Sequence, residues 1–232
     1  KEYVATVKLG VVTDTGDITG NVIKETDVNV SSDNVKNVIK SFSGEIEQTP
    51  PMYSAIKKDG VRLYKLARKG IKTDVPKRKI TVFELEMLSE INGNNEFTLR
   101  CLVSKGTYIR SLCEDIGNAL GCGATLSALK RSKTSGFDIS DCVKLENLTE
   151  DNIESYVISE ENAVMRFDEI KVTSGQATRF LNGGQLSFDR LPEREYQDGE
   201  IFRIKYEDKF LGLGFADIQN GRIAVKCVIA EK

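Results

Sequence analysis

The 232-residue chain is 40% hydrophobic and 29% charged, a composition typical of a globular protein with a buried core. Its formal net charge of -2 gives no support to nucleic-acid binding through overall charge, so an RNA site would need a local basic patch. No apolar run is long enough to span a bilayer, and the absence of histidine excludes Ser-His-Asp and Cys-His triads and histidine metal ligands.

The first predicted element is a strand over residues 2–12, in which every second residue is apolar and lies on one face: Tyr3, Ala5, Val7 and Leu9. A turn at Asp14-Thr15-Gly16-Asp17 and a second strand over about residues 21–25 complete a hairpin. From this pattern alone, Tyr3 is interpreted as a sheet tyrosine that packs against a neighbouring strand.

Ser31 or Ser32 is predicted to cap a helix that ends at Gly44 and turns its apolar residues inward: Val35, Val38, Ile39 and Phe42. Pro50 and Pro51 exclude a helix or a central strand at that point. An extended segment over residues 52–56, a turn over 58–60 and a short helix over 61–69 are expected to follow.

Two strands are predicted over residues 78–89 and 96–103, around the turn Asn92-Gly93-Asn94-Asn95. They lead into an amphipathic helix with Thr107 as N-cap and Gly121 as the residue after its end. Arg110 lies in the first turn, where the positive end of the helix dipole disfavours a cation. We therefore expect an anionic partner for Arg110, and Glu114, one turn further on, is the ordinary candidate.

The rest of the chain is predicted to form a strand over residues 124–133, helical turns over 140–156 and a domain boundary near 164–168. A helix over residues 173–182 and three strands are expected after it: residues 201–206, 210–218 and 222–229. Asn220-Gly221 is a strong hairpin signal between the last two strands.

The five cysteines include no Cys-x-x-Cys pair, which gives no support to a zinc ribbon or a thioredoxin-like site. Cys101, Cys113 and Cys227 occupy apolar-periodic positions, whereas Cys122 and Cys142 do not. Reduced, buried thiols of a cytoplasmic protein are therefore predicted.

Three stretches of the sequence resemble the bacterial tRNA pseudouridine synthase B (TruB) family. They are SKGTYIRSLCEDIGNALGCGATLSALKR at residues 104–131, KEYVATVKLGVVTDTGDITG at the start, and GEIEQTPPMYSAIKKDGVRLYKLARKG at residues 44–70. The tail, with FLNGGQL and FLGLGFADIQNGRIAVKCVIA, resembles a PUA domain, a small β-barrel-like RNA-binding module.

The resemblance implies an α+β fold, with a mixed, mostly antiparallel sheet flanked by helices over residues 1–165 and a PUA-like domain over 166–232. It implies an enzyme that isomerises a T-loop uridine of tRNA to pseudouridine. The uridine is flipped out of its stack, the glycosidic bond from N1 breaks, and C5 bonds to the ribose. Family members use no cofactor and no metal. The resemblance implies that the partner is the T-arm of tRNA, and that the protein is a cytoplasmic monomer with no membrane contact.

Carried over residue by residue, the resemblance makes Tyr3 the ring that stacks on the target uracil, and it places Tyr108 and Leu129 in the same pocket. From its position in a strand alone, Leu129 would be an ordinary core residue. The resemblance matches Arg110 to the arginine that pairs with the catalytic aspartate. Basic residues in the matching motifs are predicted to contact RNA: Lys57, Lys58, Arg62, Arg68, Lys130 and Arg131.

The family's catalytic aspartate belongs to a GxLDP motif that these 232 residues do not contain. In the family this motif lies upstream of the KEY strand, so the chain alone is predicted to be inactive. Two alternatives stay open. One is a non-catalytic RNA-binding or RNA-folding module, and the other is a structural subunit of a larger particle.

Overall fold

The computed structural model describes residues 1–71 and 73–229 and separates into two compact units, Lys1–Asp141 and Cys142–Lys232. Each unit has a hydrophobic core of its own. Among the described residues, no helix is long and apolar enough to cross a membrane.

The first unit is built on a six-stranded sheet in which all neighbouring strands are antiparallel. In sheet order the strands are β10 (Phe137–Asp138), β9 (Ala124–Thr134), β1 (Glu2–Leu9), β8 (Glu96–Val103), β7 (Arg78–Met87) and β4 (Gly44–Gln48). Two small hairpins accompany it, β2 (Val11–Thr13) with β3 (Val22–Glu25) and β5 (Lys57–Lys58) with β6 (Val61–Arg62). The helices are α1 (Ser32–Lys40), α2 (Leu63–Ala67) and α3 (Ile109–Ala119).

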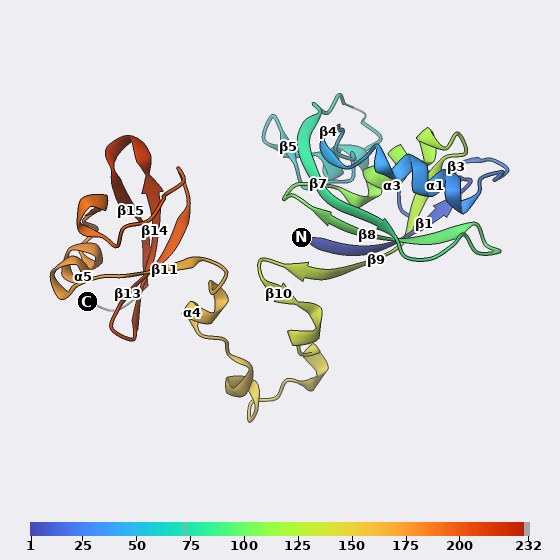
Figure 1. Cartoon of the computed structure of the whole chain (residues 1–232). Coiled ribbons are helices and arrows are strands. Elements are labelled where there is room, and N and C mark those ends of the chain that lie inside the picture. The colour runs from blue at the N-terminus through green and yellow to red at the C-terminus, as the bar shows by residue number, and fades with distance from the viewer. Residues whose placement is uncertain (72, 230–232) are drawn as a thin grey trace. The chain divides into compact units, whose positions relative to one another are not determined.

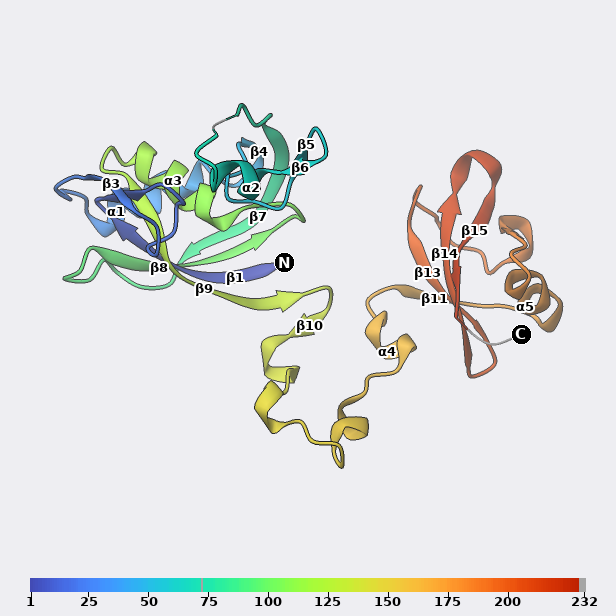
Figure 2. The same cartoon turned by 180° about the vertical axis from the view of Figure 1, so that it is seen from behind.

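Helices α1 and α3 cover one face of this sheet (Figures 1 and 2). The alternation predicted for β1 holds, because its odd-numbered residues are buried beneath the helices: Tyr3, Ala5, Val7 and Leu9. On the other face Glu2 accepts a hydrogen bond from Ser132 at 2.7 Å and pairs with Arg100 at 3.5 Å. The central strand is thus fixed between an apolar face that carries the helices and a polar face that carries ion pairs.

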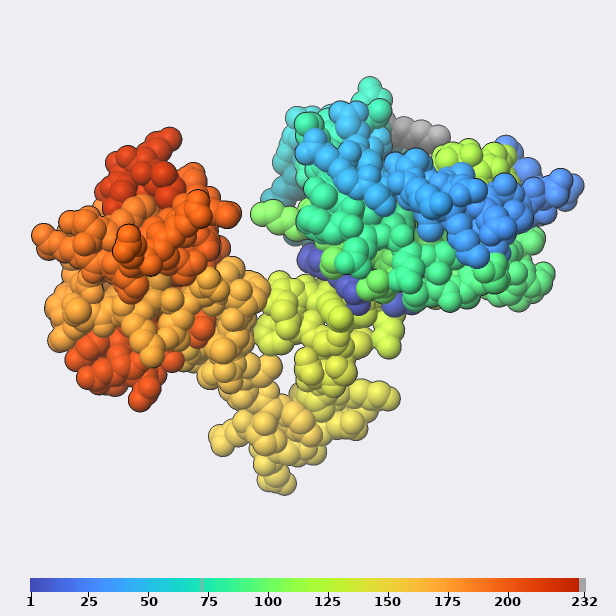
Figure 3. Space-filling model, viewed as in Figure 1, coloured from blue at the N-terminus to red at the C-terminus, as the bar shows by residue number. Residues whose placement is uncertain are grey.

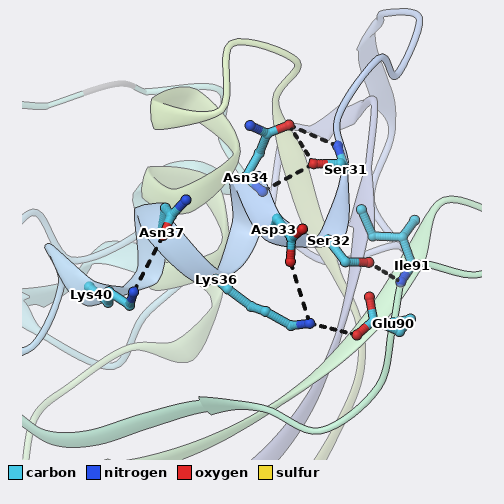
Figure 4. A network of polar contacts seen from close by, with 9 residues as sticks. All are labelled: Ser31, Ser32, Asp33, Asn34, Lys36, Asn37, Lys40, Glu90 and Ile91. Carbon is cyan, nitrogen blue, oxygen red and sulfur yellow. Dashed lines mark hydrogen bonds and ion pairs between the residues drawn. The ribbon is translucent and has the colours of Figure 1, made fainter.

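Helix α1 begins with a capping box, as predicted from Ser31 (Figure 4). The Ser31 hydroxyl accepts the Asn34 amide proton, and the Asn34 side chain accepts the Ser31 amide proton in return. The helix ends earlier than expected, with Ser41 as C-cap, and Gly44 begins β4 instead. Figure 3 shows the outer side of α1 open to solvent, and both residues of the capping box are exposed.

The second unit is a five-stranded sheet that packs against helix α5 (Ser174–Leu181). Its strand order is β11 (Asp168–Lys171), β13 (Ile201–Tyr206), β14 (Lys209–Asp217), β15 (Arg222–Val228) and β12 (Leu186–Ser187). Only the β11–β13 pair is parallel among these neighbours, so the protein as described is a mixed, mostly antiparallel α+β fold. Gly221 adopts a left-handed conformation at the predicted Asn220-Gly221 turn.

Helix α4 (Glu160–Ala163) is tied to the second unit by a network of buried charges. Glu161 pairs with Arg203 at 2.6 Å and with Lys205 at 2.9 Å, and both basic residues lie on β13. The Arg203 Nε also donates to the carbonyl of Phe167 at 2.9 Å. The division between the two compact units therefore lies upstream of the boundary predicted near residues 164–168.

The cysteines divide by burial. Cys101 and Cys113 are buried as predicted, and burial raises the pKa of Cys101 to about 12 and that of Cys113 well above its usual range. Cys122 is also buried, but the prediction for Cys227 is wrong, because this residue is exposed. The pairing of β14 with β15 shifts register between Leu213 and Gly214, so the alternation that would bury Cys227 is interrupted.

Candidate active site

The N-cap of helix α3 is Tyr108, not Thr107 as predicted, and the Tyr108 side chain makes no capping bond. The amide of Gln48, at the end of β4, contacts the Tyr108 backbone instead. Its Oε1 accepts the Tyr108 amide proton at 2.8 Å, and its Nε2 donates to the Tyr108 carbonyl at 3.1 Å. The start of this helix is thus defined by a side chain from the far edge of the sheet.

Arg110 reaches from the first turn of α3 to two loops. Its Nη1 donates to the carbonyl of Thr15 at 3.1 Å and its Nη2 donates to the carbonyl of Tyr53 at 2.7 Å. Among the described residues Arg110 forms no ion pair, with Glu114 or with another carboxylate. Its hydrogen bonds are to neutral oxygens, which orient the guanidinium and leave its charge available for an anionic group.

Glu114 lies against the turn that carries Thr15. A Cβ on Gly16, whose φ is +69°, would meet the Glu114 Oε1 at 2.5 Å. Burial raises the pKa of Glu114, Asp115 raises it further, and Arg110 lowers it by a smaller amount. The carboxylate packs against the turn, and only a glycine at position 16 leaves room for it.

Replacing Glu114 with glutamine is expected to raise the urea midpoint of unfolding at pH 7. An acid whose pKa is higher in the folded than in the unfolded state destabilises the fold as pH rises from the unfolded towards the folded value. The glutamine side chain has no charge to desolvate, so the variant should be more stable at pH 7. This difference in urea midpoint should vanish at about pH 4, near the pKa of glutamate in the unfolded chain. Urea titrations at both pH values test this, and an equal difference between the proteins at both would contradict it.

A pocket of about 390 Å³ opens beside the first turn of α3. Tyr3 from β1, Tyr108 and Arg110 from the start of α3, and Leu129 from β9 all line it. The prediction that these four side chains converge on one cavity is confirmed. The other lining residues are Lys1, Asp17, Gly106, Thr107, Ile109, Leu126 and Arg131. The volume lies in the range of small-ligand sites, which span about 300–1,000 Å³.

The pocket combines an aromatic ring, an aliphatic wall and cations. Tyr3 is 8% exposed, and the guanidinium of Arg131 lies 5.3 Å from the centre of its ring. Leu129 is 47% exposed, so it is not the core residue that its place in a strand would indicate. A planar, partly apolar group fits between such side chains.

Asp17 lies in the pocket lining and was not among the predicted site residues. Its Oδ1 accepts hydrogen bonds from the amide and the hydroxyl of Thr19, at 3.0 and 2.6 Å. Asp17 belongs to the acidic turn Asp14-Thr15-Gly16-Asp17, whose composition is that of an ordinary turn. Only the fold, which places this turn beside α3, indicates a site. Among the described residues, no cluster of acidic and thiol side chains could hold a metal ion.

The other predicted RNA contacts lie outside this pocket. Lys57 and Arg62 are directly opposite each other on the β5–β6 hairpin, where like charges repel. The Lys58 Nζ donates to the Asp74 carbonyl at 2.9 Å, and the guanidinium of Arg68 lies 5.4 Å from the centre of the Tyr64 ring. Lys130 is exposed on β9, adjacent to Arg131. Only Arg131 of these six residues lines the pocket.

Family models match residues 1–109 (TruB family pseudouridylate synthase, N-terminal domain) and residues 110–166 (tRNA pseudouridylate synthase B C-terminal domain). The chain is 46% identical to tRNA pseudouridine synthase B of Clostridium tetani, covering 92% of this chain and 73% of that protein. It is 42% identical to the protein of that name from Clostridium perfringens, covering 100% and 79%. A chain of the Cbf5-Nop10-Gar1 complex structure is 26% identical, with a TM-score of 0.71 and coverage of 98% and 66%. Together with the pocket, these matches establish that the chain belongs to the TruB family of pseudouridylate synthases.

Proposed function

We propose that this chain provides the uridine pocket of a tRNA pseudouridine synthase that acts in the T-loop. The observation that carries the proposal is the convergence of Tyr3, Tyr108, Arg110 and Leu129 on one cavity from three separate elements. These are the residues that match the family's base-binding and arginine positions. The family membership and the names of the relatives support the reaction class.

The pocket is suited to a nucleobase taken out of its stack. Flipping a uridine costs a few kcal/mol, and stacking on an aromatic ring restores about 1–3 kcal/mol per base. In this proposal one face of the uracil lies on Tyr3, and Leu129 closes the other side. The guanidinium of Arg131, which also lines the pocket, lies 5.3 Å from the centre of the Tyr3 ring, and this contact orients the ring before the base arrives.

The reaction is an isomerisation in which atoms balance without a cofactor. The bond from N1 of the uracil to C1′ of the ribose breaks, the base turns, and C5 bonds to C1′. C5 loses its proton, and N1, which carries none in uridine, gains one, so the numbers of atoms in substrate and product are equal. The group that starts this sequence is the aspartate of the GxLDP motif, which is not among these residues. Arg110, held by two carbonyls and without an ion pair, is the cation that would keep this aspartate ionised.

The experiment compares two proteins, this chain alone and the same chain preceded by a TruB-family segment that carries the GxLDP motif. Each is incubated with a T-loop stem-loop RNA that carries tritium at C5 of uridine, and tritium release is measured. We expect release only with the longer protein. Release by this chain alone would assign the chemistry to a carboxylate within it, Asp17 first, because it lines the pocket. No release by either protein would favour a non-catalytic RNA-binding module.

RNA binding is proposed to depend on local basic residues and on a PUA-like domain at residues 166–232, in a cytoplasmic monomer. The opposed cations Lys57 and Arg62 support this proposal, because an anionic phosphate between them would relieve their repulsion. Lys130 and Arg131 place two further cations beside the pocket.

The affinity of the chain for a T-loop stem-loop is expected to fall steeply as salt rises. Each phosphate contact releases counterions, so four contacts would lower the affinity about 50-fold to 150-fold between 50 and 200 mM salt. Replacing both Lys57 and Arg62 with glutamine should reduce the slope of log Kd against log salt by roughly 2. Fluorescence anisotropy measures this slope. Replacing the exposed Lys36 of α1 in the same way is the control, and an unchanged slope in the double variant would contradict the assignment.

A further inference from the structure

We propose that Gln48 is a positioning residue of the uridine pocket, an inference that rests on the proposed function. Gln48 is the last residue of the edge strand β4 and is 2% exposed. Both ends of its amide bond the backbone of one residue, Tyr108, which lines the pocket. No substrate contact is assigned to Gln48 itself, so its effect on the reaction passes through Tyr108.

The two bonds fix a helix start that has no other cap. The first amide groups of a helix have no partner within the helix, and the Tyr108 side chain supplies none. The Tyr108 carbonyl already accepts the amide proton of Leu112 at 3.1 Å, the first bond of α3. Gln48 adds a second donor to the same carbonyl and an acceptor for the Tyr108 amide. This pair of parallel bonds restricts rotation of the peptide groups on both sides of Tyr108.

The residues that follow Gln48 hold the same turn of α3 at two more points. The Ser111 hydroxyl donates to the Thr49 carbonyl at 3.0 Å, and Arg110 donates to the Tyr53 carbonyl at 2.7 Å. The segment from Gln48 to Tyr53 therefore forms a brace along the first turn of the helix. Within it, only Gln48 bonds the backbone of a residue that lines the pocket.

Loss of this brace should affect catalysis more than RNA binding. An apolar side chain in place of Gln48 would leave the Tyr108 amide buried without a partner, and relieving this cost would shift the first turn of α3. Tyr108 and Arg110 move with that turn, and a 1 Å displacement of groups around a reacting centre costs up to about a hundredfold in rate. The basic residues proposed to contact phosphates lie on other elements and would stay in place.

The kinetic test uses the protein with its GxLDP segment and the variant Gln48→Met, which keeps the length of the side chain but not its hydrogen bonds. At saturating stem-loop RNA we expect the single-turnover rate of tritium release to fall at least about tenfold, with Kd changed less than about twofold. Asn34→Ala is the matched control, because it removes the Asn34 side-chain half of the capping box of α1 in the same unit and touches no pocket residue. Its unfolding midpoint should fall while its rate stays at the wild-type value.

A second measurement separates this proposal from the proposed function. Hydrogen exchange of the amides of residues 108–112 should be at least about tenfold faster in Gln48→Met than in wild type and unchanged in Asn34→Ala. Unchanged exchange over these residues, or a wild-type rate of tritium release, would overturn the role of Gln48. Rates that fall in both variants in proportion to lost stability would also overturn it. A wild-type protein that releases no tritium would overturn the proposed function, whatever the exchange pattern.

Discussion

Replacing Arg110 with lysine should lower pseudouridine formation by the protein with its GxLDP segment by about a hundredfold or more. Lysine keeps the positive charge, but its three donors lie on one nitrogen at the end of a flexible stem and do not form the rigid fork of a guanidinium. It therefore cannot bond the carbonyls of Thr15 and Tyr53 together, at 3.1 and 2.7 Å, while it also faces a carboxylate. The single-turnover rate of tritium release at saturating RNA is the measurement.

Arg100→Lys is the matched control for this experiment. Arg100 lies on β8 and pairs with Glu2, Glu84 and Glu86, on the face of the sheet opposite the helices. The same chemical change at that site should leave the rate within about twofold of wild type, because exposed ion pairs contribute little to stability. If Arg110→Lys retained the wild-type rate, the fork geometry of Arg110 would have no part in the reaction.

Replacing Tyr3 with leucine should slow the reaction by about tenfold to a hundredfold, the value of stacking one base on an aromatic ring. Tyr3→Phe keeps the ring and its contact with the guanidinium of Arg131, so this variant should lose much less. Single-turnover rates of the two variants, at saturating RNA and measured in parallel, test this order.

The comparison of the two Tyr3 variants also separates two roles for that residue. Equal losses of single-turnover rate in Tyr3→Phe and Tyr3→Leu would mean that the reaction depends on the hydroxyl of Tyr3 and not on its ring. Tyr206→Leu, on β13 of the second unit, is the control for the loss of a partly buried tyrosine. If Tyr206→Leu lost as much rate as Tyr3→Leu, the effect at Tyr3 would not indicate a specific contact between its ring and the uracil.

Local patterns in the sequence were enough to predict most of the elements. The alternation from Tyr3 to Leu9, the capping serine Ser31 and the Asn220-Gly221 turn each depend on neighbours within a few residues, and the structure agrees with all three. The errors have local causes as well. Cys227 is exposed because β15 holds an extra residue, Lys226, between the partners of Leu213 and Gly214, and the apolar alternation alone does not reveal such a bulge.

The pocket was predicted from motifs and not from periodicity. From their strands alone, Tyr3 would be a sheet tyrosine packed on a neighbouring strand and Leu129 a core residue, but Leu129 is exposed. Two residues near the pocket were missed because their roles depend on distant contacts. Asp17 has the composition of an ordinary turn. Gln48 is one of several polar residues before the two prolines, and it bonds a residue 60 positions away. No local rule pairs positions so far apart.

The ion network around Glu161 bears on how the C-terminal part of the chain can be produced as a separate fragment. A fragment that begins at residue 166 would retain Arg203 and Lys205 in the sheet but lose the carboxylate that pairs with both at 2.6 and 2.9 Å. Arg203 is buried and Lys205 is half-buried, so the loss of this carboxylate should lower the stability of the fragment. A fragment that begins at Ser159, the residue that caps α4, keeps the helix and its carboxylate together.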